Sequence, residues 1–271
     1  MSPTSAAAVE TAKRYPFPRP GYSFLYVDGE ALPLLSLADS LEDAEIEADG
    51  GPRPAGDLLR RRGIVAASPL GRRTPVLAYG ANAAPERLRR KFGPLATAVF
   101  PVLRARLHGF DIVHAAHISS YGAVPATIQP SPGTVCDIAV TYLDEPQLAR
   151  MHETELRRRT YLFGRLSGIR LEPDLLPATD RACSYVGDCG SIARDGSPLA
   201  LAAIEAERRR FHALTQAEVQ RLIHTMLAAP GPLDAFIREA VDDESVRRAR
   251  TASLRERALP FSYAGFTPTA P

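Results

Sequence analysis

The chain has 271 residues, of which 45% are hydrophobic and 24% are charged, and its formal net charge is +2. This composition supplies one sizeable core, and the near balance of charge gives no general attraction to nucleic acid or to a membrane surface. No apolar stretch approaches the ~20 residues of a membrane-spanning helix, and residues 1–20 lack the apolar core of a secretory signal. We therefore expect a cytoplasmic protein with neither nucleic-acid nor membrane partners.

Lysine and cysteine are both sparse. Lysine occurs only at Lys13 and Lys91, so the other positively charged side chains are arginines, a bias typical of a GC-rich genome. The three cysteines, Cys136, Cys183 and Cys189, contain no CxxC pair. Their odd count and their spacing favour reduced thiols over a disulfide framework or a zinc site. We expect neither a metal nor a cofactor.

Residues 1–73 form the first of three zones and are rich in proline and glycine. We expect an N-terminal extension that is partly irregular. A short hairpin is predicted around a turn at Asp28–Gly29. The stretch 36–49 is weakly amphipathic and is predicted to form the first helix, with Ser36 as its N-cap.

Residues 74–190 carry strong strand signals separated by glycine and proline, with two short helices embedded among them. One helix is expected at Pro85–Phe92, with the proline at its first position, and the other from Glu145 to about Leu156. The pattern predicts an α+β domain built as a mostly β, small-barrel structure. The expected strands are 75–79, 99–118, 124–130, 134–143, 160–172 and 181–187.

Residues 191–271 are expected to form a helical C-terminal segment. An apolar pattern over 198–214 predicts a first helix, and Thr215 begins TQAE, a capping-box sequence that starts a second. Further short helices are expected at 231–241 and 245–259. The tail from residue 261 is expected to be a loose or docked extension.

The stretch PVLAYGANAAPERLRRKFG, residues 75–93, joins an apolar strand to a basic helix through a glycine. Such a junction turns backbone N–H groups and the positive end of a helix dipole toward one point, where a carboxylate or an oxyanion can bind. Gly80 permits close backbone approach, and Asn82 can cap the following helix. The phosphate-binding patterns GxxxxGK[ST] and GxGxxG are absent. A purely structural turn remains the alternative.

Glu155, in MHETEL, is predicted to share a helix face with the apolar residues Leu148 and Met151. A carboxylate on an apolar face is costly unless it is paired or functional, and such a group is suited to proton transfer. The alternative is a structural ion pair. The candidate partners for that pair are Arg157, Arg158 and Arg159.

Histidines and arginine runs give weaker signals. His114 and His117 lie three residues apart in a predicted strand and so face opposite sides, which makes them poor co-ligands for a metal. His152 precedes Glu155 by one helical turn and is expected to be solvated. The arginine runs lack interleaved aromatic residues and indicate solvated faces.

Taken in order, four segments of the middle zone resemble the gamma-glutamylcyclotransferase-like family. Tyr79-Gly80-Ala81-Asn82 is similar to that family's Tyr-Gly-Ser-Asn loop after the first strand. ARLHGFDIV at 105–113, ATIQPSPGTV at 126–135 and LARMHETEL at 148–156 are similar to the three segments that follow it. The resemblance covers the middle zone and leaves the first and third zones outside.

The resemblance implies a strongly bent, mixed β-barrel with short helices, and a cavity between the Tyr-Gly loop and the acid. It places the family's catalytic carboxylate, a general acid/base, on Glu155. Tyr161 and Tyr185 match tyrosines near the family's site. Family enzymes cleave a γ-glutamyl amide through attack of its own α-amine on the γ-carbonyl, which yields 5-oxoproline and a free amine without metal or cofactor. We expect the loop to bind the substrate carboxylate or oxyanion.

Two positions depart from the family pattern. Ala81 stands where the family has serine, so a hydroxyl contact is missing, and Leu156 stands where it has glycine after the acid. Three hypotheses therefore stay open. The first is a cyclotransferase acting on a small γ-glutamyl or related amide, the second is a non-catalytic module that binds a small carboxylate or another protein, and the third is an amide hydrolase or transferase for another acyl group. A binding module would not need Glu155.

Overall fold

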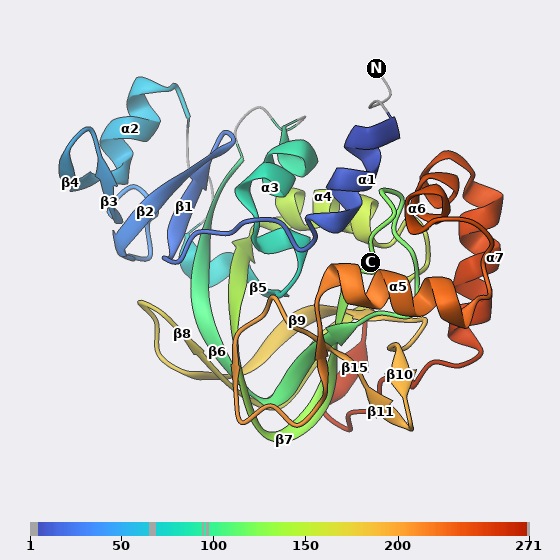
Figure 1. Cartoon of the computed structure of the whole chain (residues 1–271). Coiled ribbons are helices and arrows are strands. Elements are labelled where there is room, and N and C mark those ends of the chain that lie inside the picture. The colour runs from blue at the N-terminus through green and yellow to red at the C-terminus, as the bar shows by residue number, and fades with distance from the viewer. Residues whose placement is uncertain (1–4, 65–68, 94, 96–97, 270–271) are drawn as a thin grey trace.

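Five strands close into a mixed β-barrel in the computed structural model, which describes residues 5–64, 69–93, 95 and 98–269 (Figure 1). Hydrogen-bonded pairing runs from β7 through β5, β9, β8 and β6 and back to β7. Only the β5–β9 pair is parallel among these. The expected α+β class with a bent, mixed barrel is confirmed. The strands are β5 (Thr74–Ala78), β6 (Val99–His114), β7 (Ala126–Leu143), β8 (Tyr161–Pro173) and β9 (Thr179–Gly187).

The two strands predicted at 124–130 and 134–143 are halves of the single strand β7. Its pairing with β6 jumps from Pro130 to Val135, so the intervening Pro-Gly segment bulges out of the ladder. On β6 the jump falls at Gly109, whose φ of +78° only glycine adopts readily. This bulge bends both strands, which allows the long β6–β7 pair to curve around the barrel.

Residues N-terminal to the barrel extend its sheet. β1 (Phe24–Val27) pairs with β6, and an antiparallel meander continues through β2 (Glu30–Ser36), β3 (Glu45–Ala48) and β4 (Gly51–Pro54) to α2 (Ala55–Arg61). The hairpin predicted at Asp28–Gly29 joins β1 to β2.

The helix expected over 36–49 is wrong, because Glu45–Ala48 is strand β3. Ile46 is buried while Glu45 and Glu47 are exposed, which is the two-residue alternation of a strand. Ser36, expected as the cap, ends β2 and donates from its hydroxyl to the Glu45 carboxylate at 3.1 Å.

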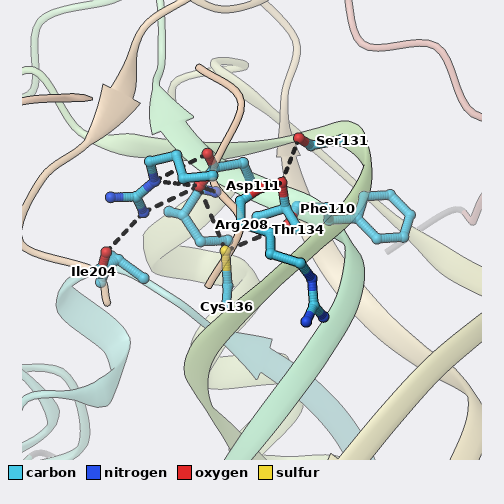
Figure 2. A network of polar contacts seen from close by, with 9 residues as sticks. Phe110, Asp111, Ser131, Thr134, Cys136, Ile204 and Arg208 are labelled. Carbon is cyan, nitrogen blue, oxygen red and sulfur yellow. Dashed lines mark hydrogen bonds and ion pairs between the residues drawn. The ribbon is translucent and has the colours of Figure 1, made fainter. Parts of the chain in front are cut away.

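The helix expected over 198–214 is also wrong. This segment lies along the barrel as short strands, and Figure 2 shows the polar contacts that hold it there. Asp111 of β6 is fully buried, and Arg209 donates to its carboxylate at 3.0 Å and to the carbonyl of Ile204 at 2.7 Å. Contacts with the barrel therefore override local helix propensity. The strands are β12 (Ala200–Leu201), β13 (Ala206–Glu207) and β14 (Ala213–Leu214).

Helices do form beyond Thr215, as expected. α5 (Gln216–Met226) begins with the predicted capping box, in which Thr215 and Glu218 bond each other's backbone N–H. α6 (Leu233–Asp242) and α7 (Glu244–Arg255) follow and enclose a second core with α1 (Ser5–Lys13), as Figure 1 shows. No helix in the described ranges is long and apolar enough to cross a membrane.

The tail is docked on the barrel, because β15 (Phe266–Pro268) pairs with β8. The remaining short elements are the 3₁₀ turns η1 (Leu70–Arg72) and η2 (Ala81–Ala83) and the small hairpin of β10 (Ala193–Arg194) and β11 (Ser197–Pro198).

Helices α3 (Pro85–Phe92) and α4 (Glu145–Glu155) pack side by side against the outside of the barrel. Leu88 and Phe92 from α3 and Met151 from α4 belong to one buried cluster. α4 starts at a capping box between Asp144 and Gln147. Both helices present their C-terminal turns to the same cavity, which fixes the position of the side chains described next.

Candidate active site

A cavity of about 290 Å³ lies where the loop after β5 meets the ends of α3 and α4. Segments far apart in the chain line it, including the N-terminal segment, the loop between β6 and β7, and strands β8 and β9. The structure brings all the sequence-predicted site residues to this one cavity, although their roles stay predictions. They are Tyr79, Gly80, Ala81, Asn82, Glu155, Tyr161 and Tyr185.

The Tyr79–Asn82 loop leaves β5 and enters the single 3₁₀ turn η2 before α3 begins. The backbone N–H groups of Ala83 and Ala84 donate to the carbonyls of Gly80 and Ala81 within that turn. The N–H groups of Gly80 and Ala81 donate to no acceptor in the part of the chain that the structure describes. Two backbone donors of residues that line the cavity are thus left without a protein acceptor in the described structure.

Glu155 is the last residue of α4, and 19% of its side chain is exposed. Its partner is Lys91, in the last turn of α3, which donates from Nζ to Glu155 Oε1. The expected alternative, a pair with one of the arginines that follow Glu155, is not what forms. Arg157, Arg158 and Arg159 are all exposed, and only Arg158 lines the cavity.

Lys91 is the functional candidate that sequence reasoning missed. Its Nζ also donates to Asn82 Oδ1 at 2.7 Å and approaches Met151 Sδ at 3.1 Å. Only 10% of its side chain is exposed, and burial lowers the pKa of Lys91 while the Glu155 carboxylate opposes that shift. The available signal was the rarity of lysine in a chain that otherwise uses arginine.

The tyrosine hydroxyls of the site are already bonded to protein groups. Tyr79 donates to the carbonyl of Tyr185, and Tyr161 donates to the carbonyl of Ala126 at 2.9 Å. The Tyr185 hydroxyl pairs with His152 Nδ1 at 2.8 Å, so His152 is not merely solvated. Burial raises the pKa of the Tyr79, Tyr161 and Tyr185 phenols, so all three are neutral. They shape the cavity with their rings.

The N-terminal segment contributes Tyr15, which sequence reasoning did not single out. Its hydroxyl accepts a hydrogen bond from the N–H of Ala126 at 2.7 Å. Its ring also stacks near Tyr121, with ring centroids 6.5 Å apart. One wall of the cavity therefore comes from a part of the chain outside the family resemblance.

The cavity lining is cationic. Glu155 is the one acidic side chain among the described residues that line it. Arg87 lies between two aromatic rings, with its guanidinium carbon 4.7 Å from the centroid of Phe17 and 4.5 Å from that of Tyr121. One terminal nitrogen of Arg87 is buried without a hydrogen-bond partner in the described structure. This excess of positive charge favours a ligand with an anionic group. The basic residues of the lining are Arg87, Arg90, Lys91 and Arg158.

His114 and His117 are both buried, and neither joins a metal cluster. His114 Nε2 contacts the carbonyl of Leu214 at 2.9 Å, and burial lowers the pKa of His114 to about 4. His117 lines the cavity edge-on to the Tyr161 ring, with centroids 5.1 Å apart, and burial lowers its pKa to about 3. Across the described residues no group of three or more His, Cys, Asp or Glu side chains is placed to hold a metal ion. All three cysteines are free thiols.

No protein-family model and no curated protein matches this sequence. Among solved structures, this chain is similar to one titled "Gamma-glutamyl cyclotransferase", with 16% identity, a TM-score of 0.35, and coverage of 71% of this chain and 91% of the other. It is equally similar to an uncharacterized protein from Homo sapiens, with 16% identity, a TM-score of 0.35, and coverage of 72% and 92%. Both likenesses concern the arrangement of the backbone and do not bear on what the cavity binds.

Proposed function

We propose that this protein cleaves a small γ-glutamyl amide by intramolecular cyclisation, releasing 5-oxoproline and a free amine. The observation that carries the proposal is the position of Glu155 in the same cavity as Gly80 and Ala81, whose N–H groups have no acceptor in the described structure. A proton-transfer group and oxyanion donors are the two parts that such a reaction requires. Neither a metal nor a cofactor enters the proposed reaction.

Glu155 serves as the general acid and base. Its Oε1 is held by Lys91, whereas Oε2 accepts no hydrogen bond from any residue that the structure describes. Oε2 takes a proton from the substrate α-ammonium, and the freed amine adds to the γ-carbonyl carbon. Glu155 then gives the proton to the amide nitrogen as its bond to carbon breaks. The ring nitrogen releases its second proton to solvent, and the departing amine takes up a proton from solvent.

The loop stabilises the charge that develops. As the carbonyl carbon becomes tetrahedral, its oxygen gains negative charge, and the N–H groups of Gly80 and Ala81 are the donors for it or for the α-carboxylate. Asn82 Oδ1 is occupied by Lys91, so Asn82 acts by holding that side chain. A curled substrate brings its own amine to the carbonyl, so proximity supplies much of the rate.

The excess of basic side chains favours a competing function, a non-catalytic module that binds a small carboxylate. Such a module would bind 5-oxoproline or a γ-glutamyl compound without turnover. We further infer from the free thiols that the protein resides in the reducing cytoplasm.

The test is product formation. Wild type and Glu155→Gln are incubated with a panel of γ-glutamyl amides, and 5-oxoproline is measured by mass spectrometry. We expect product with wild type and a loss of at least ~100-fold with the variant, as for removal of a general acid/base. Binding by both proteins in a thermal-shift assay without product from wild type would support the module instead.

A further inference from the structure

We propose that Lys91 is a positioning residue of this reaction, which fixes one oxygen of Glu155 and leaves the other placed to accept a proton from the substrate ammonium. The inference rests on the proposed function. It identifies a residue on α3 that neither the sequence motifs nor the fold assigns to the site.

The contacts of Lys91 show that it acts through Glu155. An ammonium group has three N–H donors. The three nearest acceptors of Lys91 Nζ are Glu155 Oε1, Asn82 Oδ1 at 2.7 Å and Met151 Sδ at 3.1 Å. Because all three donors are directed to protein atoms, none is left for the substrate. Lys91 therefore connects the loop after β5 to the acid at the end of α4.

The two helix ends that carry the pair are fixed to each other. Arg150 of α4 donates from Nε to the backbone carbonyl of Lys91 at 2.8 Å. Leu88 and Phe92, which flank Lys91 on α3, are buried in the cluster that contains Met151. A rigid lysine of this kind holds the Glu155 side chain in one orientation, and the free Oε2 in one place.

Lys91 is the one side chain among the described residues that donates a hydrogen bond to the Glu155 carboxylate. Burial lowers the pKa of His117 to about 3, so its ring is neutral near pH 7. Burial also lowers the pKa of His152, whose Nδ1 pairs with the Tyr185 hydroxyl. Four arginines lie around the pair, and their side chains stay charged at neutral pH. They are Arg87 and Arg90 on α3, Arg150 on α4 and Arg158 in the segment that follows α4. Burial raises the pKa of all the surrounding phenols, which belong to Tyr15, Tyr79, Tyr121, Tyr161 and Tyr185.

Lys91 therefore controls where the free oxygen of Glu155 lies. Without Lys91, the Glu155 side chain loses the contact that fixes Oε1 and can adopt other rotamers. Oε2 then spends less time where it receives the substrate proton, so the chemical step slows.

The test compares Lys91→Met with Lys13→Met. Both remove a lysine of an ion pair, and Lys13, on α1, pairs with Asp234 at 2.8 Å outside the cavity. We expect Lys91→Met to lower kcat by ~10-fold or more at neutral pH with little change in KM. Lys13→Met should behave as wild type. Lys91→Arg should retain most of kcat, because a guanidinium can still donate a hydrogen bond to Glu155 Oε1.

A second measurement does not depend on activity. The carboxyl carbon of Glu155, assigned by comparison with Glu155→Gln, is observed by ¹³C NMR at neutral pH. We expect its resonance to move in folded Lys91→Met and to keep its wild-type position in Lys13→Met. If both kcat and the resonance of Lys91→Met match wild type, Lys91 does not position Glu155 and the inference is overturned. If no γ-glutamyl amide reacts but the resonance moves, Lys91 holds Glu155 and the proposed function is what fails.

Discussion

The hydroxyl of Tyr15 accepts a hydrogen bond from the N–H of Ala126 and lies within van der Waals distance of the point that a β-carbon on Gly80 would occupy. The N-terminal segment and the Tyr79–Asn82 loop are therefore packed directly against each other. Gly80 has a negative φ of −123°, so close approach, and not the backbone angle, is the reason for glycine here.

Gly80→Ala is expected to destabilise the fold by about 1–3 kcal/mol, the usual cost of overpacking a filled site. Tyr15→Phe removes the obstructing hydroxyl, after which the nearest ring atom would be Cζ, at 3.4 Å from the new β-carbon. Gly80→Ala should then cost under ~1 kcal/mol in the Tyr15→Phe background, because an ordinary contact replaces the clash. Urea denaturation of the four proteins measures this cycle. Equal costs in both backgrounds would show that Tyr15 is not what excludes a side chain at Gly80.

Arg87 leads to a prediction about the substrate. One terminal nitrogen of Arg87 is buried without a partner among the residues that the structure describes, and the guanidinium lies between the rings of Phe17 and Tyr121. Arg87 is therefore a fixed cation at the cavity. Arg87→Met is expected to raise KM by ~10-fold or more, the effect of one charge-assisted hydrogen bond. The rise should occur for a γ-glutamyl amide with an acidic amine half and not for one with a neutral amine half, with kcat nearly unchanged.

Steady-state kinetics on one acidic and one neutral substrate measure this difference. The same increase in KM for both would mean that Arg87 contacts the shared γ-glutamyl half or only supports the cavity wall.

Sequence reasoning named residues that the fold brings to one cavity, and their roles stay predictions. The loop at Tyr79–Asn82 and the acid at Glu155 could be named because their segments have recognisable order and spacing. Lys91 and Tyr15 were missed because their importance comes from tertiary contacts, with Glu155 and with Ala126, that local pattern does not reveal. Charge alone suggested an arginine partner for Glu155, whereas helix packing selects Lys91.

Tertiary contacts that local sequence patterns do not reveal also explain the errors in predicted secondary structure. The predicted helices at Pro85–Phe92 and after Thr215 carry their own start signals, a first-turn proline and a capping box, and both formed. The stretches 36–49 and 198–214 were assigned from apolar spacing, but pairing with neighbouring strands outweighed their weak helical preference. The barrel register, which jumps at Pro130, is likewise set by tertiary pairing.

The buried histidines predict a loss of stability in acid. The pKa of His117 is about 3 in the folded protein, against ~6.5 for an exposed histidine. Between pH 7 and pH 5 the unfolded chain binds a proton at this position and the folded protein does not, so acid favours unfolding. The expected cost is about 2 kcal/mol over that range, and His114, with a pKa of about 4, adds a similar amount.

His117→Phe should therefore reduce the fall in unfolding free energy between pH 7 and pH 5 by about 2 kcal/mol. Urea denaturation at both pH values measures the change, with His212→Phe as the control because His212 is exposed. An unchanged fall in the His117→Phe protein would show that His117 is not kept neutral by burial.

The contact between Asp111 and Arg209 anchors the segment that was expected to be a helix. Asp111 is fully buried, and Arg209 supplies hydrogen bonds to it at 3.0 to 3.2 Å. Arg209→Met leaves that carboxylate buried without its cation, which is expected to destabilise the fold by about 3–5 kcal/mol. The double variant Asp111→Asn/Arg209→Met should recover most of the loss, because a neutral amide is far less costly to bury and its oxygen can still accept the N–H of Ile112. Urea denaturation gives both values, and a double variant as unstable as Arg209→Met would place the effect in the lost bond to the carbonyl of Ile204 instead.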